Sequence, residues 1–194
     1  MGSVRHRCSS MCRTDCIYVK EGGMELTTER LILRPFKLID APELQCLAGD
    51  PELAKWTRCF NSSFTLEQSV DWINRTVQQE ELNENITLSV HLKHDDTLIG
   101  AVSLMKKDMH QAELGYWLGV PFWHNGYCRE AVSKFIRFAF IKQRITRLFA
   151  RCEKDNTASQ KVMLYCGMHP ISEQYSVIMF KEREVEIATY EKII

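Results

Sequence analysis

The chain has 194 residues, which suits one ordinary domain, and its 45% hydrophobic and 26% charged residues are the balance of a soluble globular protein. Lys+Arg and Asp+Glu both number 25, so the formal net charge is zero, which argues against nucleic acid as the main ligand. The sequence shows no apolar run long enough for a bilayer, and its basic start lacks the apolar core of a secretory signal. We therefore expect no nucleic-acid and no membrane partner, and a cytoplasmic location.

Residues 1–23 differ from the rest of the chain in their patterning. They show neither the two-residue period of strands nor the roughly 3.6-residue period of helices, and they end in two glycines. From Met24 onward the hydrophobic pattern becomes regular. We therefore predict one domain over residues 24–194. Residues 1–23 are then either a flexible leader or an over-extended start, with Met24 as the true first residue.

The cysteines do not form a metal-binding pattern. Cys8, Cys12 and Cys16 are spaced C-x3-C-x3-C, whereas structural zinc sites join one C-x2-C to a second pair, and none follows. We expect no metal. The other five cysteines stand singly, which indicates reduced thiols of a cytosolic protein rather than a disulfide framework. They are Cys46, Cys59, Cys128, Cys152 and Cys166.

Periodicity and turn residues predict elements in the order β-α-α-β-β-β-α-β-α-β-β. A strand over 26–36 comes first, then a short helix capped by Asp40 and a longer helix capped by Thr65, strands over 86–92, 97–105 and 112–119, a helix over 130–141, a strand over 147–152, a helix over 156–166, and strands over 174–180 and 185–193. This order predicts a mixed sheet with helices on both faces.

The helix capped by Thr65 carries an apolar face. Val70, Ile73 and Val77 follow helical spacing, and we expect all three to face the core. Trp72 is also assigned to the core, because a Trp on an amphipathic helix is more often packed inside than part of a binding pocket.

The segment over residues 113–131, ELGYWLGVPFWHNGYCREA, has the pattern of an anion-binding junction. A strand ends at Gly119, a turn with Pro121 follows, and Asn125-Gly126 leads into a helix. A helix start offers free N–H groups and the positive end of the helix dipole, which together bind phosphate. A plain strand-to-helix connection with a turn glycine stays open, since single-glycine loops are weak signals.

This run resembles the pyrophosphate motif of GNAT acetyltransferases, and most closely the ribosomal-protein-alanine N-acetyltransferase branch. Further similar stretches follow the branch order, at 28–34 (TERLILR), 50–52 (DPE), 155–159 (DNTAS) and 165–168 (YCGM). The resemblance covers residue 25 to about 194. It implies an α/β (α+β) GNAT fold, in which a mixed, mostly antiparallel central sheet of about seven strands is flanked by four helices. The sheet is splayed at strands 4 and 5, which are the predicted strands over 112–119 and 147–152.

The resemblance also implies that acetyl-CoA lies between those two strands as acetyl donor. Backbone N–H groups would hold the pyrophosphate at His124, Asn125, Gly126, Tyr127, Cys128 and Arg129. Backbone around Trp117 and Leu118 would pair with the pantetheine arm, and one of these N–H groups would stabilise the oxyanion. His124 and Cys128 stand where the branch has smaller residues, so the loop is bulkier.

Asn156 and Ser159 match two functional residues of the family motif. In related enzymes the matching Asn contacts the cofactor arm, and the matching Ser lies near the thioester sulfur and protonates the leaving thiolate. We therefore predict both as catalytic and cofactor-binding residues of this chain. By pattern alone, Asn156 is a helix N-cap and Ser159 a first-turn residue. Other GNAT enzymes use a Tyr four residues before the glycine of this element, where this chain has Met163.

The general base is left between two carboxylates. Glu113 lies on the predicted fourth strand, on the same side as Gly115 and Trp117, although an exposed strand carboxylate is an equal interpretation. Glu173 is the second candidate. Related ribosomal acetyltransferases carry a base Glu on the fifth strand where this chain has Arg151.

These features predict transfer of acetyl from acetyl-CoA to a primary amine, foremost the N-terminal α-amine of a protein such as a ribosomal protein. Acetylation of a small amine, such as a polyamine or an aminoglycoside, and a non-catalytic acyl-CoA-binding module are the alternatives. We expect a monomer, or a homodimer formed by pairing of the exposed final strand.

Overall fold

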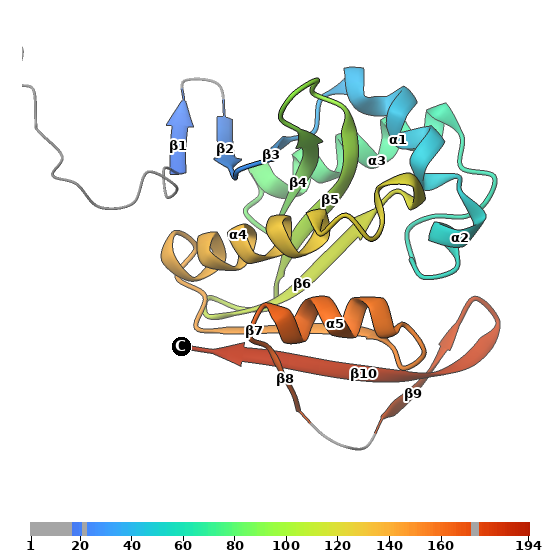
Figure 1. Cartoon of the computed structure of the whole chain (residues 1–194), viewed down its shortest axis with the longest axis vertical. Helices are drawn as coiled ribbons and strands as arrows, with labels where there is room; N and C mark the ends of the chain where they lie inside the picture. Colours follow the sequence, from blue (N-terminus) through green and yellow to red (C-terminus); the bar gives the residue numbers. More distant parts are fainter. Residues whose placement is uncertain (1–16, 21–22, 172–174) are drawn as a thin grey trace, which may run out of the picture.

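The computed structural model describes residues 17–20, 23–171 and 175–194. Within these ranges the structure has ten strands and five α-helices (Figure 1). The strands are β1 (Ile17–Lys20), β2 (Gly23–Thr27), β3 (Leu31–Pro35), β4 (Asn85–Leu92), β5 (Leu98–Lys106), β6 (Gln111–Leu118), β7 (Arg147–Glu153), β8 (His169–Pro170), β9 (Ser176–Phe180) and β10 (Arg183–Ile193). The helices are α1 (Ala41–Ala48), α2 (Pro51–Ala54), α3 (Leu66–Glu81), α4 (Tyr127–Ile141) and α5 (Thr157–Tyr165).

All strands belong to one sheet in the order β1-β2-β3-β4-β5-β6-β7-β10-β8, with β9 paired to β10. The β6–β7 pair is parallel, and the other pairs among the described residues are antiparallel. The β6–β7 pairing runs from Gln111↔Arg147 to Glu113↔Phe149, after which the two strands diverge. The predicted mixed sheet, splayed at its predicted fourth and fifth strands, is thus confirmed.

Helices cover both faces of the sheet and enclose two cores (Figure 1). On one face α1 and α3 contact β5 and β4, and their Leu44 and Ile73 are buried among the side chains of the smaller core. On the other face α4 packs across β3, β5 and β6, and α5 lies beside β7, with Phe135 of α4 fully buried. Every helix of the described residues is too short or too polar to cross a membrane.

The first predicted strand, over 26–36, is in fact a hairpin of two strands. The chain reverses between β2 and β3 because the Thr28 hydroxyl accepts from the Leu31 N–H at 2.9 Å, while the Thr28 N–H donates to the Leu31 carbonyl at 3.0 Å. This tight turn interrupts an alternation that continues in the sequence, so the pattern alone reads as one strand. Leu26 and Leu33 pair across the hairpin and are fully buried.

The range set apart as a leader contains a strand, because β1 pairs antiparallel with β2. Cys8, Cys12 and Cys16 lie outside the described residues, and so does the second candidate base, Glu173. Four helices were predicted and the structure has five among the described residues; the additional helix is α2. It is one turn long, starts with Pro51, and is capped by the Asp50 side chain, which accepts from the Glu52 N–H at 2.8 Å.

The two predicted caps have different outcomes. Thr65 caps α3 in a capping box with Gln68, as predicted. Asp40 precedes α1, but its side chain makes no cap bond, because it forms a bidentate ion pair with Arg34 at 2.9 Å and accepts from the Lys37 N–H. A bidentate guanidinium is a stronger partner for a carboxylate than an N–H group of a helix end.

The predicted apolar face of α3 is partly wrong. Ile73 is buried and Val70 packs against the smaller core, but Val77 is 38% exposed, whereas Ser69 and Thr76 are buried. Both hydroxyls donate to carbonyls of the previous turn, so these polar residues can occupy the buried face. Trp72 packs edge-on against Phe36 with the ring centres 5.0 Å apart, in agreement with its assignment to the core.

Candidate functional site

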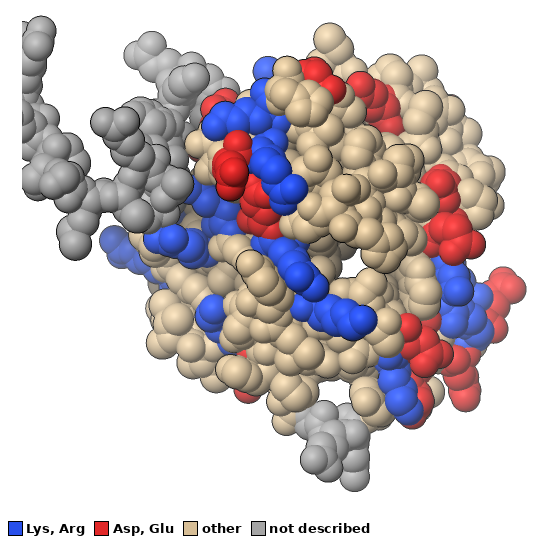
Figure 2. Space-filling view, in the orientation of Figure 1, with Lys and Arg blue, Asp and Glu red and all other residues tan. Residues whose placement is uncertain are grey.

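The splay between β6 and β7 is the centre of the site. Beyond Glu113 the strand β6 stays paired with β5 up to Leu118, while its other edge loses its partner. Figure 2 shows this face hollowed between the start of α4 and α5, with Lys and Arg side chains at the rim. Trp117 and Leu118 lie on the free stretch of β6, where the resemblance places the pantetheine arm. Backbone N–H and C=O groups of such an edge can pair with an extended ligand.

Gly100 on β5 allows this part of β6 to pack closely against β5. A Cβ at Gly100 would lie 2.2 Å from the Trp117 carbonyl oxygen, so a side chain there would push the strands apart. Trp117 also packs edge-on against Phe60, with the ring centres 5.1 Å apart. Phe60 is 2% exposed, so it belongs to the core under the site rather than to an open pocket wall.

The loop between β6 and α4 forms an uncapped helix start. It contains a short 3-10 helix, Val120–Phe122, and it is fixed by Trp123, whose Nε1 donates to the Leu118 carbonyl at 2.7 Å. Gly126 is the N-cap of α4 with φ of 79°, a left-handed conformation that glycine adopts without strain. No side chain caps this helix, so the N–H groups of its first turn remain available to an anion.

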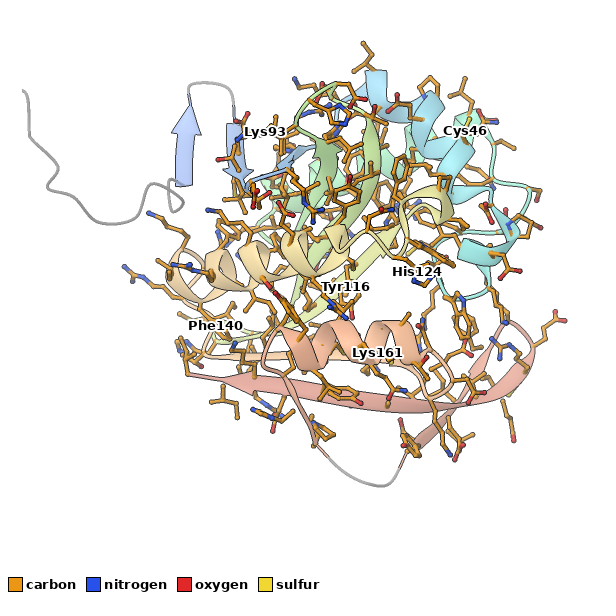
Figure 3. All side chains as sticks on the ribbon, in the orientation of Figure 1. Cys46, Lys93, Tyr116, His124, Phe140 and Lys161 are labelled. Atoms are coloured by element: carbon orange, nitrogen blue, oxygen red, sulfur yellow. The ribbon has the colours of Figure 1, made fainter. Side chains whose placement is uncertain are left out.

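His124, two residues before Gly126, also has a positive φ angle, of 62° (labelled in Figure 3). A non-glycine residue in this region carries strain of about 1 kcal/mol or more, and such strain is typical of functional loops. The Asn125 side chain donates to the Trp123 carbonyl at 2.9 Å, which closes the turn before Gly126. His124, Asn125 and Gly126 therefore form one fixed turn in front of Tyr127, Cys128 and Arg129, the residues that open α4.

A brace from the β2–β3 turn holds this loop. Glu130 accepts from the Thr28 hydroxyl at 2.6 Å, from the Arg30 N–H at 2.9 Å and from Arg30 Nε at 2.7 Å. The Arg30 guanidinium also donates to the Asn125 carbonyl at 3.0 Å and lies 4.5 Å from the centre of the Tyr127 ring. Burial acts to raise the pKa of Glu130, but the bonds from Thr28 and Arg30 outweigh it and lower the pKa below its usual value.

The brace was missed in the sequence, because its partners are about 100 residues apart. The stretch over 28–34 (TERLILR), which resembles a family motif, contains Arg30 and was the one available signal that this turn has a role.

Asn156 and Ser159 lie together at the start of α5. The predicted cap is confirmed, because Asn156 Oδ1 accepts from the Ser159 N–H at 3.0 Å. Ser159 Oγ lies 2.9 Å from Tyr116 Oη, and the same phenol donates to the Ser159 carbonyl at 3.0 Å. Figure 3 labels Tyr116 between α4 and α5. A β6 side chain therefore reaches across the splay to the residue expected near the thioester sulfur.

Two partly buried thiols, Cys128 and Cys152, lie near Tyr116 and Ser159. Burial raises the pKa of Cys128 to about 12 and the pKa of Cys152 to about 11. Burial likewise raises the pKa of Tyr116 well above its usual value. Cys152 lies within hydrogen-bonding reach of Ser159. Since the thiolate and not the thiol is the nucleophile, the raised pKa values favour the less reactive form of these cysteines at neutral pH.

Glu113 is engaged in an ion pair. Its two carboxylate oxygens accept from Arg151 Nε and Nη2, each at 2.9 Å, and Lys107 Nζ lies 3.3 Å away. The residue is 9% exposed and occupies the last paired position before β6 and β7 separate. Arg151, which stands where related enzymes carry a Glu, is thus the partner of the first candidate base. Direct proton abstraction by Glu113 would have to break this pair.

A groove of about 830 Å³ lies between α2 with the loop after it and the β9–β10 turn. It is lined by Pro51, Ala54, Lys55, Asn61, Ser62, Lys181, Glu182 and Arg183. Lys181 Nζ donates to the carbonyls of Ala54 and Phe60, at 2.5 and 2.7 Å, and so joins the two walls. Arg183 binds Glu153, the last residue of β7, at 2.7 Å. The described residues contain no cluster of His, Cys, Asp and Glu that could hold a metal.

Comparisons with known proteins agree with this geometry. The acetyltransferase (GNAT) domain family matches residues 30–169. The uncharacterized N-acetyltransferase p20 of Bacillus licheniformis is 32% identical over 142 residues, which are 71% of this chain and 78% of that protein. A candidate ribosomal-protein-serine acetyltransferase of Vibrio cholerae is 27% identical, with a TM-score of 0.76 and coverage of 88% of this chain and 97% of that one. The microcin C7 self-immunity acetyltransferase MccE, solved with acetyl-CoA and AMP, is 23% identical and shows the shared fold alone, with a TM-score of 0.79 over 90% of this chain and 98% of that one.

Proposed function

The chain belongs to the GNAT acetyltransferase family and uses acetyl-CoA to acetylate an amine, and from that premise we propose that its acceptor is the N-terminal α-amine of a protein, such as a ribosomal protein. The similarity to the Vibrio cholerae protein supports this acceptor class. The proposed setting is the cytoplasm, in keeping with five free thiols among the described residues.

The observation that carries the proposal is the ion pair of Glu113 with Arg151. An α-amine has a pKa of about 7.7–8.0, so a fair fraction is neutral near pH 7.5 without help. A lysine amine, with a pKa of about 10.4, needs roughly 3.5 kcal/mol more than an α-amine for deprotonation and thus depends on a free base. Glu113 is held by Arg151, so it is not a free base. A weakly assisted site of this kind suits an α-amine.

The proposed reaction is a direct attack on the thioester. The N–H groups of residues 124–129 bind the pyrophosphate, and backbone around Trp117 and Leu118 binds the pantetheine arm and stabilises the oxyanion. Asn156 contacts the cofactor arm and fixes the first turn of α5. When the C–S bond breaks, its electron pair stays on sulfur. Sulfur takes the Ser159 proton, and the proton released by the amine returns to Ser159 through water.

We propose that the acceptor enters through the groove between α2 and the β9–β10 turn, where the charge of the lining favours one acceptor class. Its lining contains Lys55, Lys181 and Arg183, and since Arg183 is paired with Glu153, two cations remain against the carboxylate of Glu182. A polyamine or an aminoglycoside carries several positive charges and needs acidic partners, so this lining disfavours both. A peptide whose positive charge is confined to its N-terminus is accommodated more readily.

The test is a mass-spectrometric assay with acetyl-CoA and a panel of acceptors. The panel contains a peptide with a small N-terminal residue, the same peptide with a blocked N-terminus and an internal lysine, spermidine and an aminoglycoside. We expect acetylation of the free α-amine alone. Acetylated spermidine or aminoglycoside would assign the enzyme to small amines, and a modified lysine in the blocked peptide would contradict the argument from Glu113.

A further inference from the structure

Tyr116 is a partly buried group that the reaction above does not use. It belongs to the row of alternate β6 side chains, with Leu114 and Leu118, that faces α4 and α5. From there its hydroxyl reaches the first turn of α5 and contacts both the carbonyl and the hydroxyl of Ser159. The contact joins β6 to α5 on the side of the splay where the thioester sulfur is expected.

We propose that Tyr116 is the positioning residue that holds the Ser159 hydroxyl as the proton donor to the leaving CoA thiolate. The inference rests on the function proposed for Ser159 and adds a residue from another element. Helix α5 has Met163 where other enzymes of the family place a tyrosine, so this phenol approaches from the sheet instead.

The hydrogen-bonding capacities of the two hydroxyls support the assignment. The phenol has one proton, and the Ser159 carbonyl can only accept. When the phenol donates to that carbonyl, the Ser159 proton is free to point at Tyr116 and is stored there. When the phenol instead donates to Ser159 Oγ, which lies 2.9 Å from Tyr116 Oη, the Ser159 proton must point away from Tyr116. The second arrangement also stabilises negative charge that develops on Oγ as its proton moves to sulfur.

The surroundings keep this arrangement in place. Asn156 fixes the backbone of Ser159 through the cap bond of 3.0 Å, so the hydroxyl has little freedom besides rotation about χ1. The high pKa of Tyr116, caused first by burial, keeps the phenol protonated and therefore able to donate. The neighbouring Cys152 thiol is also protonated and does not compete for the proton as a base.

The experiment titrates the thiol of CoA bound to the enzyme, followed by the ultraviolet absorbance of the thiolate. A donor aimed at sulfur favours the thiolate, so bound CoA should ionise at lower pH in the wild type than in Y116F or S159A, by about one pKa unit, which corresponds to tenfold. The double variant Y116F/S159A should equal S159A, because Tyr116 acts through Ser159. The turnover number should fall about tenfold in Y116F with the KM for acetyl-CoA unchanged.

Tyr190 supplies the matched control. Its buried side chain also donates to α5, to Gln160 Oε1 at 3.1 Å, one residue from Ser159. Y190F should retain the wild-type thiol titration, although it too loses a tyrosine bond to α5. Equal thiol titration in the wild type and Y116F, or an equal shift in Y190F, would overturn the proposal. Because the titration needs no acceptor, its result stands even where every peptide in the acceptor panel fails to react.

Discussion

The brace between the β2–β3 turn and the start of α4 should control the affinity for acetyl-CoA. Replacing Arg30 with Met keeps the aliphatic part of the side chain and the backbone N–H bond to Glu130. It removes the bond of 2.7 Å from Nε to Glu130, the bond of 3.0 Å to the Asn125 carbonyl, and the stacking over Tyr127. The loop that carries the predicted pyrophosphate N–H groups thereby loses its side-chain tether.

The magnitude follows from these three contacts. Arg30 is 44% exposed, so screening reduces the ion pair to about 1 kcal/mol. The bond to the carbonyl adds about 0.5–1 kcal/mol, and the cation–π contact about 0.5 kcal/mol. Full transmission of about 2 kcal/mol to the loop would weaken acetyl-CoA binding about 30-fold. We expect an increase in Kd of at least fivefold in calorimetry, with kcat at saturating acetyl-CoA unchanged.

Arg147→Met is the control for this measurement. Arg147 forms an ion pair with Glu191 at 2.8 Å and donates a hydrogen bond to the side-chain oxygen of Gln111 at 3.0 Å. Its exposed fraction of 41% is similar to the 44% of Arg30. Its contacts lie at the closed end of the β6–β7 pair, away from the loop. Both variants should lose similar stability, but only Arg30→Met should bind acetyl-CoA more weakly. Wild-type affinity in Arg30→Met would refute the reasoning, and equal weakening in both variants would reduce it to a general loss of stability.

Three further changes have defined outcomes. Ser159→Ala and Asn156→Ala should lose most turnover while keeping acetyl-CoA affinity, as steady-state kinetics and calorimetry would establish; unchanged rates in both would refute the catalytic assignment. Thr65→Ala should reduce the free energy of unfolding by about 1 kcal/mol in urea titration, because it removes the cap of α3. For Cys128 and Cys152 the folded pKa exceeds the usual thiol value of 9.0, so the stability they contribute is complete below pH 9 and is lost as the pH rises toward 11–12; urea titrations across that range should show it, and a flat profile would contradict the buried neutral thiols.

The sequence predicted best what depends on neighbouring residues. Thr65 and Asn156 were identified as caps because the bonded N–H lies three residues away along the chain. Asp40 has the same local signature, but Arg34 on the adjacent strand takes its carboxylate. Local spacing therefore identifies the position of a helix start, whereas the partner of a charged cap depends on tertiary packing.

Contacts distant in the sequence could not be predicted in this way. Strand alternation places Glu113 and Tyr116 on opposite faces of β6, but it does not indicate what each face meets. Glu113 was a candidate base in the sequence and meets a guanidinium in the structure, whereas Tyr116 went unnoticed and meets Ser159, 43 residues away. The resemblance supplied Ser159 and Asn156, and the fold was needed to supply their neighbour.

Three polar contacts together define the splay. At its closed end the Glu113–Arg151 pair joins β6 to β7 at the last paired position. At the entrance, Arg30 and Glu130 hold the loop that starts α4. On the α5 side, Tyr116 ties β6 to Ser159. Each contact joins an element that borders the splay to a partner distant in sequence. None of these contacts depends on pairing between β6 and β7 beyond Glu113. An opening maintained in this way exists before the ligand binds, so the binding free energy of acetyl-CoA is not reduced by the separation of paired strands.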